Sequence, residues 1–236
     1  MAHIIITGAS RGIGFETALE FSTQMEHKIL AISRSQTGLV QLFQIANQLN
    51  PEVNIRTLSM DLISDDFTRL DSMVDEFLNG QVDILINNAG ALILKPFEKN
   101  SIQDFQNQLN INFLAPIRII QALLPYFNSQ GAHIVNIGSM AGFSGSQKFL
   151  GLSAYSSSKG ALHALTECLA LELQERKIKT NALALGAVQT EMLEEAFGDY
   201  KAPVLAYEMG AYIAQFALTG HLYFNGKVIP VAQSNP

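Results

Sequence analysis

The chain has 236 residues, which is enough for one large or two small domains with a full hydrophobic core. Its 48% hydrophobic and 15% charged residues are typical of a globular, rather apolar protein. The net charge is −6 and the basic residues do not cluster, so we expect no binding to nucleic acid.

Several features bear on where the protein works. No segment reaches the roughly 18 uninterrupted apolar residues that a membrane-spanning helix needs. The short apolar run 4–6 near the N-terminus has no charged leader or cleavage site, so we expect no signal peptide and a cytoplasmic protein. The single cysteine, Cys168, excludes an internal disulfide and fits a reducing compartment. Its apolar neighbours Leu165 and Leu169 predict a thiol within the core.

Short apolar runs rich in β-branched residues alternate with amphipathic stretches along the chain. This alternation is typical of parallel sheets in which helices connect the strands. Two of the runs are almost continuously apolar, which predicts strands covered on both faces. We expect strands at 3–7, 28–33, 54–59, 82–87, 132–138, 178–184 and 227–231, and helices near 13–24, 38–50, 65–79, 101–126, 153–175 and 203–218. No linker or repeat interrupts the pattern, so we expect one domain over 1–236.

The fourth predicted helix has a defined start and an expected irregularity. Ser101 and Asp104 form a Ser-x-x-Asp signature, which satisfies the first free backbone donors of a helix. Pro116 lies inside this helix and should bend it or mark a break.

A glycine-rich turn, Thr7–Gly14, lies between the first predicted strand and the first predicted helix. Its glycines Gly8, Gly12 and Gly14 let backbone amides approach a phosphate, and the helix N-terminus adds favourable partial charge. Such a turn alone is more often only a turn, but this position favours a pyrophosphate cradle. It lacks the Lys-Ser/Thr ending of a triphosphate loop, which disfavours NTP hydrolysis.

The end of the second predicted strand indicates which dinucleotide would bind. Arg34 lies 20 residues after Gly14, where an NAD site would place an acid for the ribose hydroxyls. A guanidinium can instead hold a 2′-phosphate through two charge-assisted bonds, and Arg11 is expected beside it. We therefore expect NADP(H), with NAD(H) possible; the alternative is that both arginines simply face solvent.

Tyr155 and Lys159 lie four residues apart on a predicted helix, so their side chains project from one face. Such a pair alone is usually a solvated surface. However, a neighbouring ammonium favours the phenolate and lowers the pKa of a tyrosine from its usual value of about 10. A tyrosine in that setting can exchange a proton with a substrate oxygen.

Together these motifs resemble those of the short-chain dehydrogenase/reductase family. Thr7–Gly14 is similar to the family's TGxxxGxG loop, Asn87–Gly90 to its NNAG segment, and Tyr155–Lys159 to its YxxxK pair. Ser139 and Asn112 occupy its other catalytic positions, and the matches span residues 3 to about 231. The resemblance implies a Rossmann-type doubly wound parallel sheet of about seven strands, with helices on both faces.

The resemblance also implies residue roles. Tyr155 would exchange a proton with the substrate oxygen, and Ser139 would orient that oxygen. Lys159 would lower the pKa of Tyr155 and hold the nicotinamide ribose, while Asn112 would position a water in a proton relay. Asn87 is better interpreted as a structural tie between strands. The residues expected to bind the cofactor are Gly8, Ser10, Arg11, Gly12, Ile13, Gly14, Arg34, Asp61, Leu62, Asn88, Ala89, Gly90, Tyr155, Lys159, Val188 and Thr190.

The chain departs from the family pattern at two places. Leu185 stands where the family usually has Pro, which we expect to loosen the backbone where cofactor and lid meet. The 16 positions from Ser139 to Tyr155 are slightly more than usual, which enlarges the loop 143–153 beside the substrate. The candidate lid residues are Met192, Leu193, Phe197 and Tyr200.

The stretch 160–173 is apolar on most faces of its predicted helix, which is typical of a helix buried on more than one side. We expect one side to meet the sheet and the other a second subunit, giving a homodimer or homotetramer. The alternative is a helix capped only by a loop.

These observations predict an NADP(H)-dependent oxidoreductase that interconverts a carbonyl and an alcohol, with a small-molecule substrate. Lys148 and a few acids are the only expected charged handles in the loop and lid, which indicates a neutral, partly apolar carbonyl compound. No two histidines have metal-ligand spacing, so no metal site is expected. The alternatives are a catalytically silent dinucleotide-binding sensor of the same fold, or an extended epimerase or dehydratase. The latter needs a second substrate domain, for which the 46 residues after Thr190 are too few.

Overall fold

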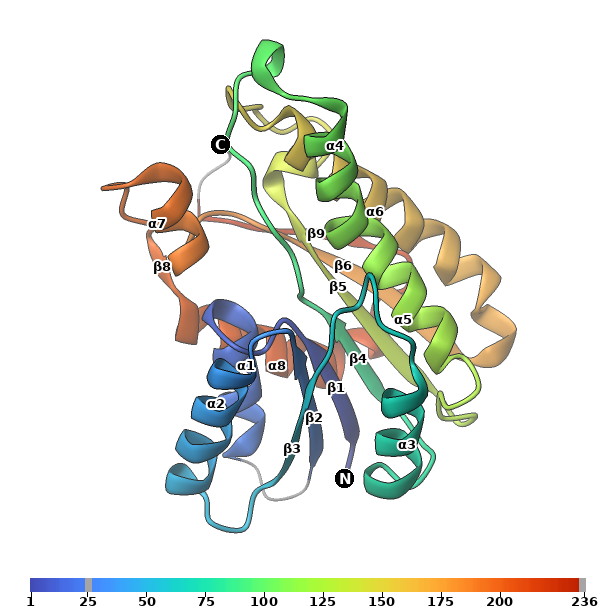
Figure 1. Ribbon diagram of the computed structural model, residues 1–236. Coiled ribbons are helices and arrows are strands. Elements are labelled where there is room, and N and C mark those ends of the chain that lie inside the picture. Colours follow the sequence, from blue (N-terminus) through green and yellow to red (C-terminus); the bar gives the residue numbers. More distant parts are fainter. Residues whose placement is uncertain (24–26, 234–236) are drawn as a thin grey trace.

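Seven parallel strands form a central sheet between two layers of helices in the computed structural model, which describes residues 1–23 and 27–233 (Figure 1). The strand order is β3-β2-β1-β4-β5-β6-β9, so the chain winds outward in both directions from the β1/β4 pair. This confirms the predicted doubly wound sheet. The strands are β1 (His3–Thr7), β2 (Lys28–Ser33), β3 (Asn54–Ser59), β4 (Ile84–Asn87), β5 (Ala132–Ser139), β6 (Ile178–Leu185) and β9 (Val228–Val231).

Helices cover both faces of the sheet, as the apolar strands predict. One layer holds α1 (Gly12–Ser22), α2 (Gln36–Leu49) and α8 (Ala206–Thr219) (Figure 1). The opposite layer holds α3 (Thr68–Phe77), α4 (Ile102–Leu109), α5 (Ala115–Leu123) and α6 (Ser153–Glu172). The first predicted helix extended to residue 24, which lies outside the described residues. Short 3₁₀ turns occur at Phe97–Lys99, Met140–Gly142, Gln174–Arg176 and Gly220–Leu222.

The strands divide the core into two clusters because successive side chains point to opposite faces. On β1, Ile4 and Ile6 belong to the cluster under α1, α2 and α8, whereas Ile5 belongs to the cluster under α3 and α5. All three isoleucines are fully buried. The sheet is therefore held from both sides, and its strand ends form a rigid edge.

The fourth predicted helix is broken, as Pro116 indicates. The reciprocal cap of Ser101 and Asp104 starts α4, and Pro116 lies in the first turn of α5. Between them the chain takes a π-helical turn, Asn110–Leu114. Proline cannot donate an amide hydrogen to the carbonyl of Asn112, four residues earlier, so a continuous α-helical ladder cannot form there.

Two short pieces between β6 and α8 were not predicted. The helix α7 (Glu191–Phe197) begins at Thr190, whose hydroxyl accepts a hydrogen bond from the amide of Leu193. The two-residue strands β7 (Val188–Gln189) and β8 (Val204–Leu205) pair on either side of it. Residues 188–205, called the lid from here on, lie beside the end of the sheet (Figure 1).

The expectation that Cys168 is a core thiol is wrong, because Cys168 is exposed. The helix α6 buries Leu162, Thr166 and Ala170, and at 100° per residue Cys168 falls on another face. Within the described part of the chain, no helix is both long and apolar enough to cross a membrane.

Candidate active site

A cleft runs along the carboxyl edge of the sheet, above the β1/β4 junction where open α/β sheets bind ligands. It consists of a cavity of about 190 Å³ over the glycine loop and one of about 440 Å³ over β5, β6 and α6. The two are neighbours, because their walls share Ile13, Asn88, Gly90, Thr190 and Met192.

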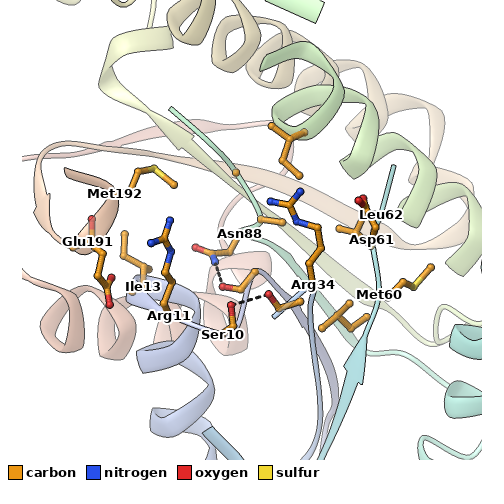
Figure 2. A pocket seen from close by; sticks show the side chains of 18 residues that line it. Ser10, Arg11, Ile13, Arg34, Met60, Asp61, Leu62, Asn88, Glu191 and Met192 are labelled. Carbon is orange, nitrogen blue, oxygen red and sulfur yellow. Dashed lines mark hydrogen bonds between the residues drawn. The ribbon is translucent and has the colours of Figure 1, made fainter. Parts of the chain in front are cut away.

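Close packing between the glycine loop and the end of β4 forms the floor of the smaller cavity. The Thr7 hydroxyl accepts hydrogen bonds from the amides of Asn88 and Ala89, each 3.1 Å long. The Asn88 side-chain amide donates to the carbonyl of Thr7 at 3.1 Å and to that of Gly8 at 3.2 Å, and Figure 2 draws the second of these bonds. Gly8 and Gly12 have φ values of +68° and +57°, a region that favours glycine.

A phosphate-binding turn needs backbone that is bare of side chains, and this loop meets that requirement. A Cβ atom on Gly8 would lie 2.7 Å from the Cα atom of Ala89. Glycine at this position therefore lets the loop pack against the segment after β4, while Gly8 itself lines the smaller cavity.

Gly14 has a different position from the one predicted. It does not line the cleft but lies beneath the loop, where a Cβ atom would be 2.2 Å from Asn88 Nδ2 and 2.5 Å from the Gly8 carbonyl oxygen. A glycine at this position lets α1 pack against the loop.

The smaller cavity brings together most of the residues predicted to bind a cofactor. Those in its wall are Gly8, Ser10, Arg11, Gly12, Ile13, Arg34, Asp61, Leu62, Asn88, Ala89, Gly90 and Thr190. The wall also contains Met192, which was predicted as a lid residue, and five residues that were not predicted at all: Ile32, Ser33, Met60, Ile111 and Glu191. Three of these residues lie at or next to the ends of β2 and β3, directly before the predicted residues Arg34 and Asp61. This position in the sequence was a signal for Ile32, Ser33 and Met60.

The two arginines at this cavity differ in their partners. Figure 2 shows Arg11 and Arg34 on either side of Asn88, with Ser10 bonded to Ser33 below them. Arg34 is exposed and has no ion-pair partner within the described residues. Arg11 instead pairs with Glu195 of α7 at 2.6 Å. The sequence predicts Arg11 beside Arg34 as a second group for a 2′-phosphate. Instead, Glu195 occupies its guanidinium group.

Three polar side chains meet in the larger cavity: Ser139 from the end of β5, and Tyr155 and Lys159 from α6. The Ser139 hydroxyl lies within hydrogen-bond reach of the Tyr155 phenol and also accepts from the amide of Ala141 at 3.2 Å. The Lys159 ammonium donates to the Ile137 carbonyl at 2.8 Å and lies 6.0 Å from the centre of the Tyr155 ring.

The expectation that Lys159 lowers the pKa of Tyr155 is wrong, because this pKa is raised. Burial raises the pKa of Tyr155, and its hydrogen bond with Ser139 opposes this only in part. Burial lowers the pKa of Lys159 to about 8. Both directions have the same cause, because a low-dielectric environment disfavours the charged form of each group.

Asn112 is fully buried in the π-helical turn, outside both cavity walls. Its carbonyl oxygen accepts from the amide of Ala91 at 3.0 Å, and its amide donates to the Ala91 carbonyl at 2.9 Å and to the Ser158 hydroxyl at 3.0 Å. Asn112 therefore joins the loop after β4 to α6. Asn87 ties β4 to β5 through a 2.8 Å bond to Asn136, which confirms its structural interpretation.

His163, one turn beyond Lys159, is a buried neighbour of the site that was not predicted as part of it. A Cβ atom on Gly138 would lie 2.1 Å from His163 Nε2, so the ring packs directly against the residue before Ser139. Burial, followed by the charge of Lys159, lowers the pKa of His163 to about 4, and the ring is neutral at pH 7.

The backbone at Leu185 is not loosened, contrary to expectation. Leu185 is the last residue of β6 and pairs with Val231, and the next amide, of Gly186, donates to the Val231 carbonyl at 2.9 Å. The leucine side chain is buried at the wall of the larger cavity. Strand pairing with β9 therefore fixes the segment that a proline would otherwise restrict.

Most of the wall of the larger cavity is apolar. Its walls include the predicted lid residues Met192, Leu193, Phe197 and Tyr200 together with Leu92, Met140, Phe149, Leu152 and Val204. Lys148 is not a charged handle, because its ammonium donates to the carbonyls of Ala141 and Phe143 at 3.0 and 2.6 Å.

Comparisons with known proteins agree with this fold and cleft. A sequence model of the short chain dehydrogenase family matches residues 2–201. L-xylulose reductase of Mesocricetus auratus is 34% identical over 205 residues, which cover 85% of this chain and 78% of that protein. An NADP-dependent 3-hydroxy acid dehydrogenase of Schizosaccharomyces pombe is 33% identical over 192 residues, with coverage of 80% and 72%. The crystal structure of levodione reductase superposes with a TM-score of 0.85 at 24% identity, covering 98% of this chain and 96% of that one.

The fold and the cleft define a dinucleotide-binding α/β oxidoreductase. The chain belongs to the short-chain dehydrogenase family and is an NAD(P)-dependent enzyme of that family.

The packing of Gly14 predicts a stability difference between two helical glycines. Gly14→Ala should destabilise the protein by about 1–3 kcal/mol, because the added methyl group overlaps Asn88 and the Gly8 carbonyl. In a chain of this size that lowers Tm by roughly 2–12 °C. The matched control is Gly160→Ala in α6, where the nearest atom to the new Cβ is 3.5 Å away, so its Tm should be unchanged or raised. Equal Tm values for the two variants in thermal unfolding would contradict this packing.

Proposed function

We propose that this protein interconverts a carbonyl and an alcohol with NADP(H), and that Tyr155 is the proton donor and acceptor. The observation that carries the proposal is the meeting of Ser139, Tyr155 and Lys159 in the larger cavity, next to the glycine-loop cavity. A bound nicotinamide dinucleotide would supply the hydride.

The environment of Tyr155 supports its role as an acid in carbonyl reduction. Burial raises its pKa, so the phenol is protonated at pH 7 and holds a proton to donate. The Ser139 hydroxyl, within reach of the phenol, would orient the substrate oxygen. Lys159, with its pKa at about 8, is mainly charged at pH 7 and would stabilise the phenolate left after proton transfer.

We assign a positioning role to Asn112, because its bonds to Ala91 and Ser158 fix the loop after β4 against α6. A Cβ atom on Gly90 would lie 2.9 Å from the Asn112 side-chain oxygen and 3.5 Å from Lys159 Nζ. Asn112 and Lys159 therefore approach the same glycine, which supports their participation in one polar network.

The cavity supports a neutral, partly apolar carbonyl compound as substrate. Apart from Lys159, its walls contain no lysine, arginine, aspartate or glutamate within the described residues. Lys159 donates to the Ile137 carbonyl and is assigned to the phenol, so a charged substrate would lose hydration over walls that are otherwise uncharged, which is unfavourable. Aromatic and aliphatic side chains such as Phe149, Leu152 and Leu193 favour an apolar group next to the carbonyl.

We assign the preference for NADP(H) chiefly to Arg34. Its guanidinium is exposed at the end of β2 and lines the cavity beside Ser10 and Ser33. An acid to hold the ribose hydroxyls of NAD(H) is absent from the adjacent residues 32–36.

We further propose that the protein self-associates through the outer face of α6, as a homodimer or homotetramer. Cys168 and Leu171 are exposed there, and 75% of Leu171 is accessible. Exposed apolar side chains three residues apart on one helix lie on the same face and support an interface there. A light-scattering mass equal to one chain at micromolar concentration would contradict this proposal.

Replacing the phenol tests the proposed chemistry. Tyr155→Phe should lower kcat for NADPH-dependent carbonyl reduction by about 10²–10⁴-fold, because the proton donor is lost while the ring remains. NADPH affinity, measured by calorimetry, should change little. Tyr223→Phe, at an 80% exposed tyrosine outside the cleft, is the control and should keep wild-type kcat.

Undiminished kcat in Tyr155→Phe would remove Tyr155 from its assigned role. The sensor alternative would be supported if the wild-type protein binds NADPH but none of a broad panel of ketones, aldehydes and quinones causes NADPH oxidation.

Reversing the charge at Arg34 tests the cofactor preference. Arg34→Asp should weaken NADPH binding by about 10- to 100-fold, the value of a lost charge-assisted bond, and affect NADH much less. Arg176→Asp makes the same charge change in a 3₁₀ turn outside the cleft and should alter neither affinity. Equal losses for NADPH and NADH in Arg34→Asp would reject the assignment.

A further inference from the structure

The ion pair between Arg11 and Glu195 joins the glycine loop to the lid. Arg11 Nη1 lies 2.6 Å from one carboxylate oxygen of Glu195, and Nη2 lies 3.5 Å from the other. Both side chains are more than half exposed, 53% for Arg11 and 62% for Glu195. Both terminal nitrogens of the guanidinium are thus directed at a carboxylate of the protein itself.

Other carboxylates lie close to this pair. Glu191 lines the same cavity, with an oxygen 3.5 Å from the Cβ position at Gly12 (Figure 2). Hydrogen bonding to Glu195, with further charge from Glu191, raises the pKa of Arg11. Burial and the charge of Glu191 raise the pKa of Glu16. Arg11 therefore lies near two carboxylates, those of Glu195 and Glu191, at one end of the smaller cavity.

We propose that Glu195 is a specificity-determining residue, which competes with the 2′-phosphate of NADP(H) for Arg11 and so reduces the preference for NADP(H) over NAD(H). The inference rests on the proposed function, because it requires a dinucleotide in this cleft.

The competition follows from the geometry of the guanidinium group. Its paired N–H groups can bind one carboxylate or one phosphate side by side, but the same pair cannot bind both at once. A 2′-phosphate that binds Arg11 through its two terminal nitrogens must displace Glu195. NADH has no 2′-phosphate and can bind with the Arg11–Glu195 pair intact.

The size of the effect is limited by solvent. Exposed ion pairs contribute little net stability, so removing the competitor should change affinity by about two- to fivefold. A change of that size is measurable for one cofactor against the other in the same protein.

The chain offers a matched control on the same helix. Glu194 precedes Glu195 and carries the same charge, but its carboxylate accepts a 2.6 Å hydrogen bond from the Gln189 side chain. Glu194→Gln and Glu195→Gln therefore change the net charge equally, and only the second releases Arg11. Both sites are exposed, so neither substitution should prevent folding, which Tm will verify.

The experiment is calorimetric titration of wild type, Glu195→Gln and Glu194→Gln with NADPH and with NADH. We expect Glu195→Gln to tighten NADPH binding two- to fivefold and to leave NADH unchanged. Glu194→Gln should change the ratio of the two affinities by less than Glu195→Gln does. In an Arg11→Gln background, the further substitution Glu195→Gln should no longer tighten NADPH selectively.

Three outcomes would overturn the proposal while leaving NADP(H) binding intact. They are unchanged or weaker NADPH binding in Glu195→Gln, equal tightening of NADPH in the two glutamate variants, and selective tightening that persists without Arg11. A wild-type protein that binds neither dinucleotide would overturn the proposed function as well.

Discussion

The contact between the glycine loop and the segment after β4 is the constraint on which the rest of the site depends. The Thr7 hydroxyl accepts two amides from Asn88 and Ala89, and the Asn88 side chain bonds back to the loop. These bonds form only because Gly8 and Gly14 have no side chains to fill the space. The sheet holds both segments rigidly, since β1 and β4 are neighbours buried on both faces. The result is an exposed patch of backbone at the strand switch, where open α/β sheets bind ligands.

A second set of bonds connects that patch to α6, which carries the proposed proton donor. Asn112 bonds to Ala91, just beyond the segment, and to Ser158 on α6, one residue before Lys159. Lys159 in turn donates to the Ile137 carbonyl of β5. Burial of these polar groups is unfavourable unless they are paired, so their bonds fix the position of α6 against the sheet edge. The same burial has two effects. It raises the pKa of Tyr155, and it makes the loss of any hydrogen-bond partner in this polar network costly in free energy.

Local patterns predicted the sheet, because strand and helix periodicity and the loop glycines depend on nearby residues. The alternation of runs identified all seven strands of the sheet, and Pro116 identified the broken helix. The sequence could not predict which charged groups pair across the cleft. Arg11 meets Glu195 over a separation of 184 residues, and Lys148 folds back onto its own loop. The pKa of Tyr155 was predicted in the wrong direction because spacing shows a neighbouring ammonium but not the burial that opposes it. The lid helix α7 was missed because its seven residues are too few to show a period.

Thermal unfolding with and without NADPH tests the central claim most directly, because a ligand that binds only the folded state must stabilise it. At a free concentration of 100 times Kd, NADPH adds about 2.7 kcal/mol to the free energy of unfolding. For a chain of this size the account predicts a rise in Tm of roughly 5–11 °C. An unchanged Tm at millimolar concentrations of both reduced and oxidised dinucleotides would contradict it.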